Sequence, residues 1–442
     1  MLLKKKKDYK FKENGRFNVD ISIKMAALKD PFSVVPPADE MIVFLRQHIG
    51  TEAEMLVNVG DSVKYGQKIG EIPKGILGAP IHSPVNGKII ELSKKFHPVS
   101  GEKETAVTIE TMNEEQEPFF EPLNPDEEPS EVLLERVRES GIVGLGGASF
   151  PTHIKLSPSQ KISHLIINAK ESDPNIACDC RLMIEKPRAI ISGINIMAKI
   201  LDVKDITVAT RTQEGETPEF EALLKEHNIK LERMPPNYSI GSEKLLVKEI
   251  LGKEIPSGKF PTDVGILVHN VATAYAVDDA IENGNPLISR GLTYYSTDLG
   301  GKNLWVRMGT PVEHVLNFLG ESPSKFNRIV LGSILMGSTI ANPSYPILKA
   351  TSAVTGFTDK ESDPYRNPLP CIRCGYCNTV CPVYIYPQLI MEAEKKNDVD
   401  RLRKLHVEDC IECGLCSYVC PSRIRFTRYL TNGKNLVKNQ EF

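Results

Sequence analysis

Between residues 132 and 284, short apolar runs alternate with segments in which apolar residues recur at helical spacing. The runs have the length of buried strands, and the segments between them have the period of amphipathic helices. In chain order the segments are HLIINA (164–169), the helical stretch 186–201, DITVAT (205–210), the helical stretch 218–228, IKLERM (229–234), and a strand, turn and helix over 264–283. Strands that alternate with helices favour a parallel sheet, so this part is predicted to be an α/β domain with a largely parallel sheet.

The flanking regions have other patterns. Residues 285–345 predict strands near 289–297 and 303–307 followed by a helix, which fits a small β-grasp module. Residues 39–112 contain VNVGDSVKYGQKIGEI and GAPIHSPVNGKIIEL, two β-rich stretches that bracket glycine-containing turns. This pattern resembles the barrel-sandwich hybrid fold of biotinyl and lipoyl domains. Lys74 is the lysine of the equivalent hairpin, and it lacks the flanking methionines of a biotin site, so we expect an unmodified, lipoyl-like domain.

The fold class predicted from these patterns is a multidomain α/β protein. It has an N-terminal barrel-sandwich hybrid, an α/β domain, a β-grasp module and a C-terminal helical ferredoxin-like domain, and the family resemblance given below implies that the α/β domain is of the flavin type. The predicted boundaries are an N-terminal tail at 1–38, the barrel-sandwich hybrid at 39–112, a Glu- and Pro-rich linker at 113–131, the α/β domain at 132–284, the β-grasp module at 285–345, a linker at 346–365, the cysteine-rich domain at 366–430 and a C-terminal tail at 431–442.

Eight of the ten cysteines lie in two matched runs, CIRCGYCNTVCP and CIECGLCSYVCP. Each run has the spacing C-x2-C-x2-C-x3-C-P, in which three thiolates surround one [4Fe–4S] cluster and the fourth reaches the other cluster. We therefore predict two clusters with crossed fourth ligands. One is held by Cys371, Cys374, Cys377 and Cys420, and the other by Cys381, Cys410, Cys413 and Cys416.

Two other uses of these cysteines are zinc ribbons and disulfides. Zinc sites give no reason for the repeated fourth Cys-Pro, and disulfides need an oxidising compartment. The basic start MLLKKKKDYKFK has no apolar core after it, so we expect no secretory signal. Lys4–Lys7 are expected to be a solvated tail, with a contact to an anionic membrane surface as the alternative. Cys178 and Cys180, outside the runs, are expected to be reduced structural thiols, with a redox or metal role as the alternative.

Charge and hydropathy narrow the function further. The formal net charge is -3 and the isoelectric point about 6.4, which gives no support for nucleic-acid binding. No apolar stretch is long enough to span a membrane. The expected protein is therefore an electron carrier that is soluble or peripheral to a membrane.

The segment GLGGASFPT at 144–152 has the glycines that let a backbone approach a phosphate or a flat ring closely. Taken alone, such a run is also typical of a structural turn. Together with LIINAKESDPNIACDCRLM at 165–183, HNVATAYAV at 269–277 and the two cysteine runs, it resembles the RnfC family. These proteins are the cytoplasmic, cluster-bearing subunits of the Rnf/Rsx ion-translocating electron transport complex, and they are related to the flavin- and NADH-binding subunit of respiratory complex I.

The resemblance implies a role in a translocase. Such a subunit passes electrons between NADH and ferredoxin-like carriers through FMN and the two clusters, coupled to ion movement. It is peripheral, at the cytoplasmic side of the inner (cell) membrane, with the other Rnf/Rsx subunits as partners. The cofactor-binding residues carried over by motif are Gly144, Gly146, Gly147, Lys155, Asn168, Glu171, Asn270 and Thr273. Lys155 would face the flavin phosphate or a ring carbonyl.

This chain also departs from the family pattern. Ser149 stands where the family usually has glycine, and Lys170 stands in a motif that is usually small or acidic there. Segments 239–242 and 332–334 differ as well. These changes predict FMN retention with weakened NADH oxidation. The alternatives are a scaffold subunit that keeps its clusters but oxidises no NADH, and a soluble iron–sulfur partner of a reductase.

Overall fold

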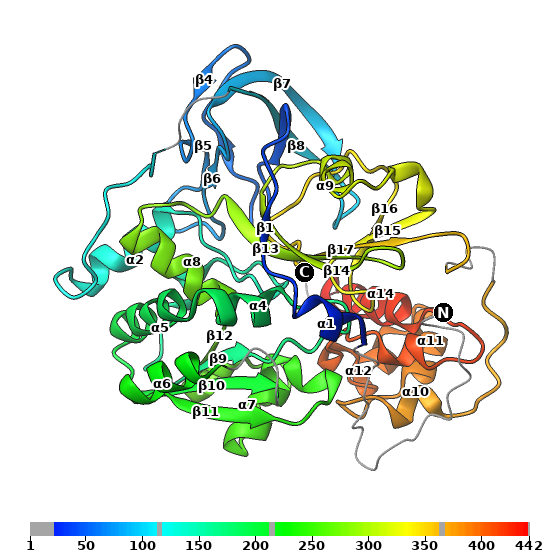
Figure 1. The fold of residues 1–442 in the computed structure, drawn as a ribbon. Coiled ribbons are helices and arrows are strands. Elements are labelled where there is room, and N and C mark those ends of the chain that lie inside the picture. The colour runs from blue at the N-terminus through cyan, green and yellow to red at the C-terminus, as the bar shows by residue number, and fades with distance from the viewer. Residues whose placement is uncertain (1–21, 113–116, 212–216, 362–366, 441–442) are drawn as a thin grey trace.

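The computed structural model describes residues 22–112, 117–211, 217–361 and 367–440 (Figure 1). The Lys4–Lys7 segment lies outside the described residues. The barrel-sandwich unit stands at the top of Figure 1, the α/β domain at the lower left, and the cysteine-rich helical unit at the lower right. Each unit has a core of its own buried apolar residues, so the predicted multidomain fold class is confirmed.

The α/β domain is built on a four-stranded sheet in which every pairing is parallel. Its order is β11-β10-β9-β12, and the strands are β9 His164–Ala169, β10 Asp205–Arg211, β11 Lys230–Met234 and β12 Ile266–Asn270. Leu165, Ile166 and Ile167 are all fully buried, because helices cover both faces of such a sheet. The predicted strands are confirmed, and their carboxyl ends meet at one edge.

The helices of this domain are α2 Ser130–Glu139, α3 Thr152–Lys155, α4 Cys178–Glu185, α5 Pro187–Leu201, α6 Pro218–Glu226, α7 Glu243–Leu251 and α8 Val271–Glu282, with 3-10 turns η1 Tyr238–Gly241 and η2 Pro261–Val264. Helices α5, α6 and α8 lie over the predicted segments, whereas α3, α4 and α7 were not predicted. Helices α5 and α8 cross at Gly193, where an added Cβ would lie 1.8 Å from the Ala274 carbonyl oxygen. The close approach of these two helices therefore requires glycine at 193.

A six-stranded sheet of order β1-β14-β13-β17-β15-β16 forms the middle of the molecule. Its elements are β1 Ser33–Val34, β13 Ser289–Ser296, β14 Gly300–Arg307, β15 Arg328–Leu331, β16 Ser338–Ile340 and β17 Ala353–Phe357, with α9 Val312–Phe318 and the 3-10 turn η3 Pro323–Lys325. The two predicted strands and the helix are present.

Two predicted boundaries differ from this sheet. The linker predicted over 346–365 contains β17, which pairs with β13 and β15 and is buried throughout. Its Thr and Gly content disguised a strand whose register is set by neighbours far away in sequence. The tail predicted over 1–38 supplies α1 Ser22–Ala27 and β1, which pairs with β14.

The barrel-sandwich unit consists of two small sheets of order β2-β8-β7-β4 and β3-β5-β6. The strands are β2 Glu40–Phe44, β3 Glu54–Met55, β4 Ser62–Val63, β5 Lys68–Glu71, β6 Ile81–His82, β7 Gly87–Phe96 and β8 Lys103–Thr111. Lys74 is exposed and pairs with Glu135 of α2 at 2.9 Å. That Lys74 is unmodified remains a prediction.

The predicted linker at 113–131 is attached to the α/β domain in its described part. The Phe120 amide donates to the Gly284 carbonyl at 3.0 Å, and the Leu123 amide donates to Ile281 at 2.8 Å. Helix α2 then begins at Ser130. The Glu and Pro content therefore marked an exposed segment correctly, but not one without contacts.

The cysteine-rich unit is helical, as predicted between the runs. Its elements are α10 Tyr376–Thr379, α11 Pro387–Glu394, α12 Val399–Lys404, η4 Val407–Asp409, α13 Leu415–Tyr418 and α14 Phe426–Lys438. Most of the predicted tail at 431–442 belongs to α14, whose Leu430 and Val437 are buried against α11 and α12. Within the described residues, no helix has the length and apolar character of a membrane span.

Gly193→Ala should destabilise the α/β domain by roughly 1–3 kcal/mol, because the new methyl group meets backbone rather than a flexible side chain. Trp305, the only tryptophan, contacts Tyr275 of α8 at 5.5 Å between ring centroids, so its fluorescence reports unfolding here. Gly433→Ala in α14 is the matched control, since its Cβ would lie 3.2 Å from the side-chain end of Leu402. Equal unfolding midpoints in urea for the two variants would contradict the packing argument.

Candidate functional site

The glycine-rich loop between α2 and α3 is closed by its own backbone. The Gly144 amide donates to the Phe150 carbonyl at 2.9 Å, and the Ser149 amide donates to Gly144 at 3.2 Å. Ser149 has φ +49°, a left-handed conformation that favours glycine. Its hydroxyl is buried without a partner among the described residues. The backbone thus explains why glycine suits this position.

A cavity of about 360 Å³ opens between this loop and the carboxyl ends of β9 and β12. It collects six of the eight predicted cofactor residues, namely Gly144, Gly146, Lys155, Asn168, Glu171 and Asn270. The other two are not among its lining residues. Gly147 lies in the loop, and a Cβ added there would meet none of the described residues within 4 Å. Thr273 is fully buried and accepts the Leu145 amide at 2.9 Å, so it supports the loop from behind.

Two polar residues of the cavity are held by neighbouring segments. Lys155 pairs with Glu243 of α7 at 2.5 Å. The Asn168 side chain donates to the Gly241 carbonyl at 2.9 Å and accepts the Lys170 amide at 3.1 Å. Lys155 therefore lies in the cavity as predicted, with a carboxylate as its partner. Its contact with a flavin phosphate or ring carbonyl remains a prediction.

Glu171 is a buried carboxylate in the wall of this cavity. It accepts the amides of Asp179 at 3.0 Å and Cys180 at 3.4 Å. Lys24 of α1, itself fully buried, lies 3.7 Å from a Glu171 carboxylate oxygen. Burial raises the pKa of Glu171 to about 7, and the Lys24 ammonium opposes that rise. The sequence did not predict the role of Lys24. This residue lies in the predicted tail among several other lysines, and nothing in the local sequence indicates that it is buried.

Lys170 follows β9 and lines the same cavity. Its side chain is 3% exposed, and its ammonium donates to the Asn237 carbonyl at 2.5 Å and to the Ser172 hydroxyl at 2.9 Å. The Lys170 side chain therefore forms part of the cavity wall. Its ammonium group points at the Asn237 backbone carbonyl.

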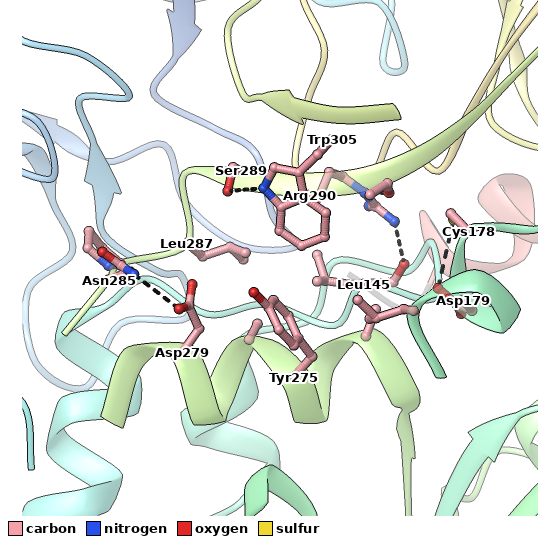
Figure 2. A pocket seen from close by; sticks show the side chains of 15 residues that line it. Leu145, Cys178, Asp179, Tyr275, Asp279, Asn285, Leu287, Ser289, Arg290 and Trp305 are labelled. Atoms are coloured by element: carbon pink, nitrogen blue, oxygen red, sulfur yellow. Dashed lines mark hydrogen bonds between the residues drawn. The ribbon is translucent and has the colours of Figure 1, made fainter. Parts of the chain in front are cut away.

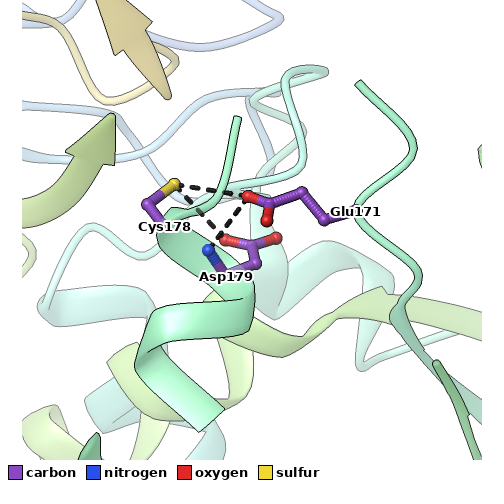
Figure 3. Close-up of side chains that lie close together, drawn as sticks. All are labelled: Glu171, Cys178 and Asp179. Carbon is purple, nitrogen blue, oxygen red and sulfur yellow. Dashed lines mark hydrogen bonds between the residues drawn. The ribbon is translucent and has the colours of Figure 1, made fainter. Parts of the chain in front are cut away.

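Cys178, Asp179 and Glu171 form a tight buried group at the start of α4 (Figure 3). The Cys178 sulfur lies 3.6 Å from Glu171 and 3.9 Å from Asp179. Burial, followed by these two carboxylates, raises the pKa of the Cys178 thiol. Two buried cations, Lys24 and Arg290, act on the two carboxylates. Burial thus favours the protonated thiol, and the two cations offset the charge of the two carboxylates.

A second, much smaller cavity of about 20 Å³ lies behind this group, between α8 and the β13–β14 hairpin (Figure 2). Leu145 and Asp179 line both cavities. Arg290 spans the wall between them and donates to the Leu145 carbonyl at 3.3 Å. Asn270 donates to the other side of Asp179 at 2.5 Å. This network holds the glycine-rich loop against α4 and α8.

The eight cysteines of the two runs surround two further cavities. One of about 360 Å³ is lined by Cys371, Cys374, Cys377 and Cys420, and a smaller one of about 20 Å³ is lined by Cys381, Cys410, Cys413 and Cys416. These are the two crossed sets that the spacing predicts. Which cysteine binds which cluster remains a prediction.

The chemistry of these sets fits iron–sulfur clusters. The Arg373 amide donates to the Cys371 sulfur and the Glu412 amide to the Cys410 sulfur, both at 3.4 Å. Such bonds stabilise thiolates bound to iron. Burial raises the pKa of Cys410 to about 11 and of Cys413 to about 12. Metal binding releases the protons of cysteine ligands, so a bound iron centre would offset this effect of burial.

The second cysteine loop also forms part of the wall of the large cavity beside the glycine-rich loop. Ile411 and Cys413 line that cavity. An added Cβ at Gly414 would lie 2.5 Å from the Leu335 carbonyl oxygen. Tyr238, Leu335, Leu415 and Val419 belong to one apolar cluster at this junction. The cysteine set with Cys413 is therefore in direct contact with the glycine-loop cavity.

Comparisons with known proteins agree with this arrangement. The family model of the Nuo51 FMN-binding domain matches residues 137–279. The RnfC barrel sandwich hybrid domain matches 21–114, and the 4Fe-4S dicluster domain matches 363–421. FMN and [4Fe–4S] clusters are the cofactors of these domains. Cavity, cysteine sets and matched domains together define an electron-transfer protein of the flavin and iron–sulfur class.

Relatives of known name show which family of this class the chain belongs to. The RnfC subunit of the ion-translocating oxidoreductase complex of Rhodobacter capsulatus is 38% identical over 78% of this chain and 67% of that protein. The protein of the same name from Salmonella arizonae is 35% identical over 86% of this chain and 57% of its own length. This chain therefore belongs to the RnfC family of ion-translocating oxidoreductase complexes. It spans about half to two thirds of the length of these curated relatives.

A crystal structure of an NAD+-reducing [NiFe]-hydrogenase in the H2-reduced state shares the fold. The TM-score is 0.52 at 17% identity, covering 72% of this chain and 65% of the hydrogenase chain. This likeness concerns the fold alone.

Lys24→Met should make stability depend more steeply on pH. The folded pKa of Glu171 lies above its ordinary 4.5, so the folded protein holds this proton more tightly, and stability falls as pH rises from there towards about 7. Without the ammonium the pKa rises further, and the fall continues to higher pH. The loss relative to the unmodified protein should widen above about pH 7, by at most about 1.4 kcal/mol per pH unit.

Urea unfolding over that pH range measures the effect. Lys29→Met, at an exposed lysine of the same segment, should leave the pH dependence unchanged. Adding Glu171→Gln to Lys24→Met should remove the widening. If the double variant keeps it, another group is responsible.

Paired cysteine substitutions test the crossed sets. Anaerobically purified protein should hold about eight iron per chain, as two cubanes demand. Cys420→Ser and Cys371→Ser should alter the same EPR signal, and Cys381→Ser and Cys410→Ser the other. Cys180→Ser, at a buried thiol outside the runs, is the control and should leave both signals unchanged. If Cys420→Ser groups with Cys410→Ser, the assignment is wrong.

Proposed function

We propose that this chain is a peripheral subunit of an Rnf-type complex that passes electrons between NADH and a ferredoxin-like carrier. The electrons run through FMN and two [4Fe–4S] clusters, coupled to ion translocation. We place it at the cytoplasmic face of the inner membrane, held by the other subunits of the complex. Family membership and the matched FMN-binding and dicluster domains support this proposal.

The observation that most strongly supports this proposal is that residues of the second cysteine loop form part of the wall of the glycine-loop cavity. When bound, FMN takes up two electrons as hydride and releases them singly. The residues of this chain would place the flavin next to a cysteine set. Gly144 and Gly146 leave room for close approach, while Ile411 and Cys413 put a cysteine set at the same cavity. The apolar cluster around Leu415 and Leu335 keeps water from this junction.

The burial of the cysteines indicates the order of the two sets along the path from the cavity to the surface. Cys413 and Cys416 are intermediate or buried, whereas Cys371 and Cys374 of the other set are exposed. The cavity-side set is therefore the inner relay, and the exposed set is the outer one. Electrons pass between the cavity and the exterior through both.

Slow reaction with NADH is the second candidate. Its support is Lys170, whose side chain fills part of the cavity wall where the family pattern is small or acidic. A nicotinamide must lie flat on the flavin for hydride transfer, and small misplacements cost rate steeply. In this variant of the proposal the chain exchanges electrons with a carrier but takes few from NADH.

Anaerobic stopped-flow mixing with NADH tests both candidates. Flavin bleaching reports hydride transfer, and EPR of rapidly frozen samples reports cluster reduction. Gly414→Ala should slow cluster reduction on the order of tenfold, because its methyl group pushes the cysteine loop away from Leu335. Gly375→Ala is the matched control. Its φ of +79° equals the +78° of Gly414 within a degree, yet an added Cβ meets no atom of the described part of the chain within 4 Å.

The outcomes separate the candidates. Fast bleaching followed by cluster reduction supports the NADH-oxidising function. Absent bleaching with NADH, together with normal flavin reduction by clusters that dithionite has reduced, supports the second candidate. Clusters that never exchange electrons with bound FMN would overturn both.

A further inference from the structure

The two cysteine loops are local copies of each other. Arg373 and Glu412 both have φ +54°, and Tyr384 and Arg423 both have φ +57°. Each loop turns at a glycine with φ near +79° and continues into a one-turn helix, α10 or α13. A position in one loop therefore has a structural counterpart in the other, so their surroundings can be compared residue by residue.

Their surroundings differ. On the second loop, Ile411 and Cys413 face the glycine-loop cavity, and Gly414 packs on Leu335. On the first loop, the counterpart Ile372 is 67% exposed. Its glycine counterpart, Gly375, has nothing within 4 Å of an added Cβ among the described residues. The face that lines the glycine-loop cavity on the second loop is therefore exposed on the first loop.

We propose that the open face of the first loop is the docking surface for a separate one-electron carrier protein whose own face is acidic around an apolar centre. This surface, the open loop face, consists of Leu369, Ile372, Arg373, Cys374 and Tyr376. The inference rests on the proposed electron-transfer function and extends it to the site and kind of partner. One electron crosses the contact, no bond forms or breaks, and the carrier itself is the oxidant or reductant.

Exposed apolar side chains mark the centre of this surface. Ile372 and Leu369 are 67% and 54% exposed, and Tyr376 is 38% exposed. All residues from 367 to 374 are exposed, including two cysteines of the outer set. Exposed apolar residues around a redox centre indicate an interaction site rather than a free surface.

Charge indicates the sign of the partner. Residues 367–440 contain eleven Lys and Arg against seven Asp and Glu, a net charge of +4 in a chain of net charge -3. Glu412 of the second loop is paired with Lys434 at 2.7 Å, but its counterpart Arg373 has no ion-pair partner among the described residues. Glu392 is the acidic residue that lines the outer cysteine cavity. The net positive charge of this segment, with Arg373 on the open loop face, steers an acidic partner to the surface.

Charge reversal on the holoprotein tests the proposal. The probe is an acidic [2Fe–2S] ferredoxin, reduced and freed of excess reductant, mixed with oxidised protein while cluster bleaching is followed. Arg373→Glu should lower the second-order rate constant about tenfold at low ionic strength and much less at high salt. Glu412 shows that this loop backbone accepts glutamate. Ile372→Ser should lower the rate several-fold, independently of salt.

Matched controls keep the test specific. Lys404→Glu, at an exposed position of α12, makes the same change of net charge away from the loop. Val59→Ser removes a similarly exposed apolar side chain from the barrel-sandwich unit. Both should leave the rate within about twofold. Iron content of each variant confirms intact clusters, and Arg373→Gln replaces Arg373→Glu if iron is lost.

Two results would overturn the docking surface: equal effects of Arg373→Glu and Lys404→Glu, or no effect of either loop substitution. Failure of the proposed function looks different. In that case the clusters of the unmodified protein accept electrons from ferredoxin with normal sensitivity to Arg373→Glu, but bound FMN is not reduced afterwards.

Discussion

The cysteine-rich unit meets the rest of the molecule beside the glycine-loop cavity, where Gly414 lies against the Leu335 carbonyl in an approach that only glycine permits. A side chain at 414 would lie 2.5 Å from that oxygen, and the backbone there has φ +78°. Glycine thus meets two demands at one position, a left-handed turn and a close approach. Since Cys413 is the adjacent residue and lines the glycine-loop cavity, the same contact sets how near a cluster can come to a cofactor in that cavity.

Balanced buried charge is the second constraint on this cavity. Glu171 and Asp179 are buried together, and burying carboxylates without partners is costly. Lys24 reaches them from α1, and Arg290 from β13. Helix α1 in turn packs on β14, where an added Cβ at Gly301 would meet Ala27 at 2.5 Å. The N-terminal segment therefore supports the cavity wall through Glu171 without lining the cavity itself, so the α/β domain and the central sheet cannot shift separately without exposing or unpairing these charges.

The sequence was informative where spacing or period alone determines structure. The cysteine sets follow from two equal runs, and the parallel strands follow from apolar runs of strand length between helical segments. Strand β17 was missed because AVTGF is too small and polar to stand out, and only its neighbours β13 and β15 make it a strand. Lys24 could not be predicted, since nothing in its local sequence distinguishes it from the exposed Lys29. The departure at Ser149 was visible in sequence, but its φ of +49° required the structure.

The two cysteine loops share their spacing and backbone conformation but have different surroundings. Both donate an amide to the first cysteine sulfur at 3.4 Å, so local hydrogen bonding does not distinguish them. Exposure does, because Cys371 and Cys374 face solvent while Cys413 and Cys416 lie against the protein interior. Reduction adds negative charge, which water stabilises better than an apolar interior, and cluster potentials depend on solvent exposure. Exposure therefore distinguishes the environment of the outer set from that of the inner set, which local hydrogen bonding does not.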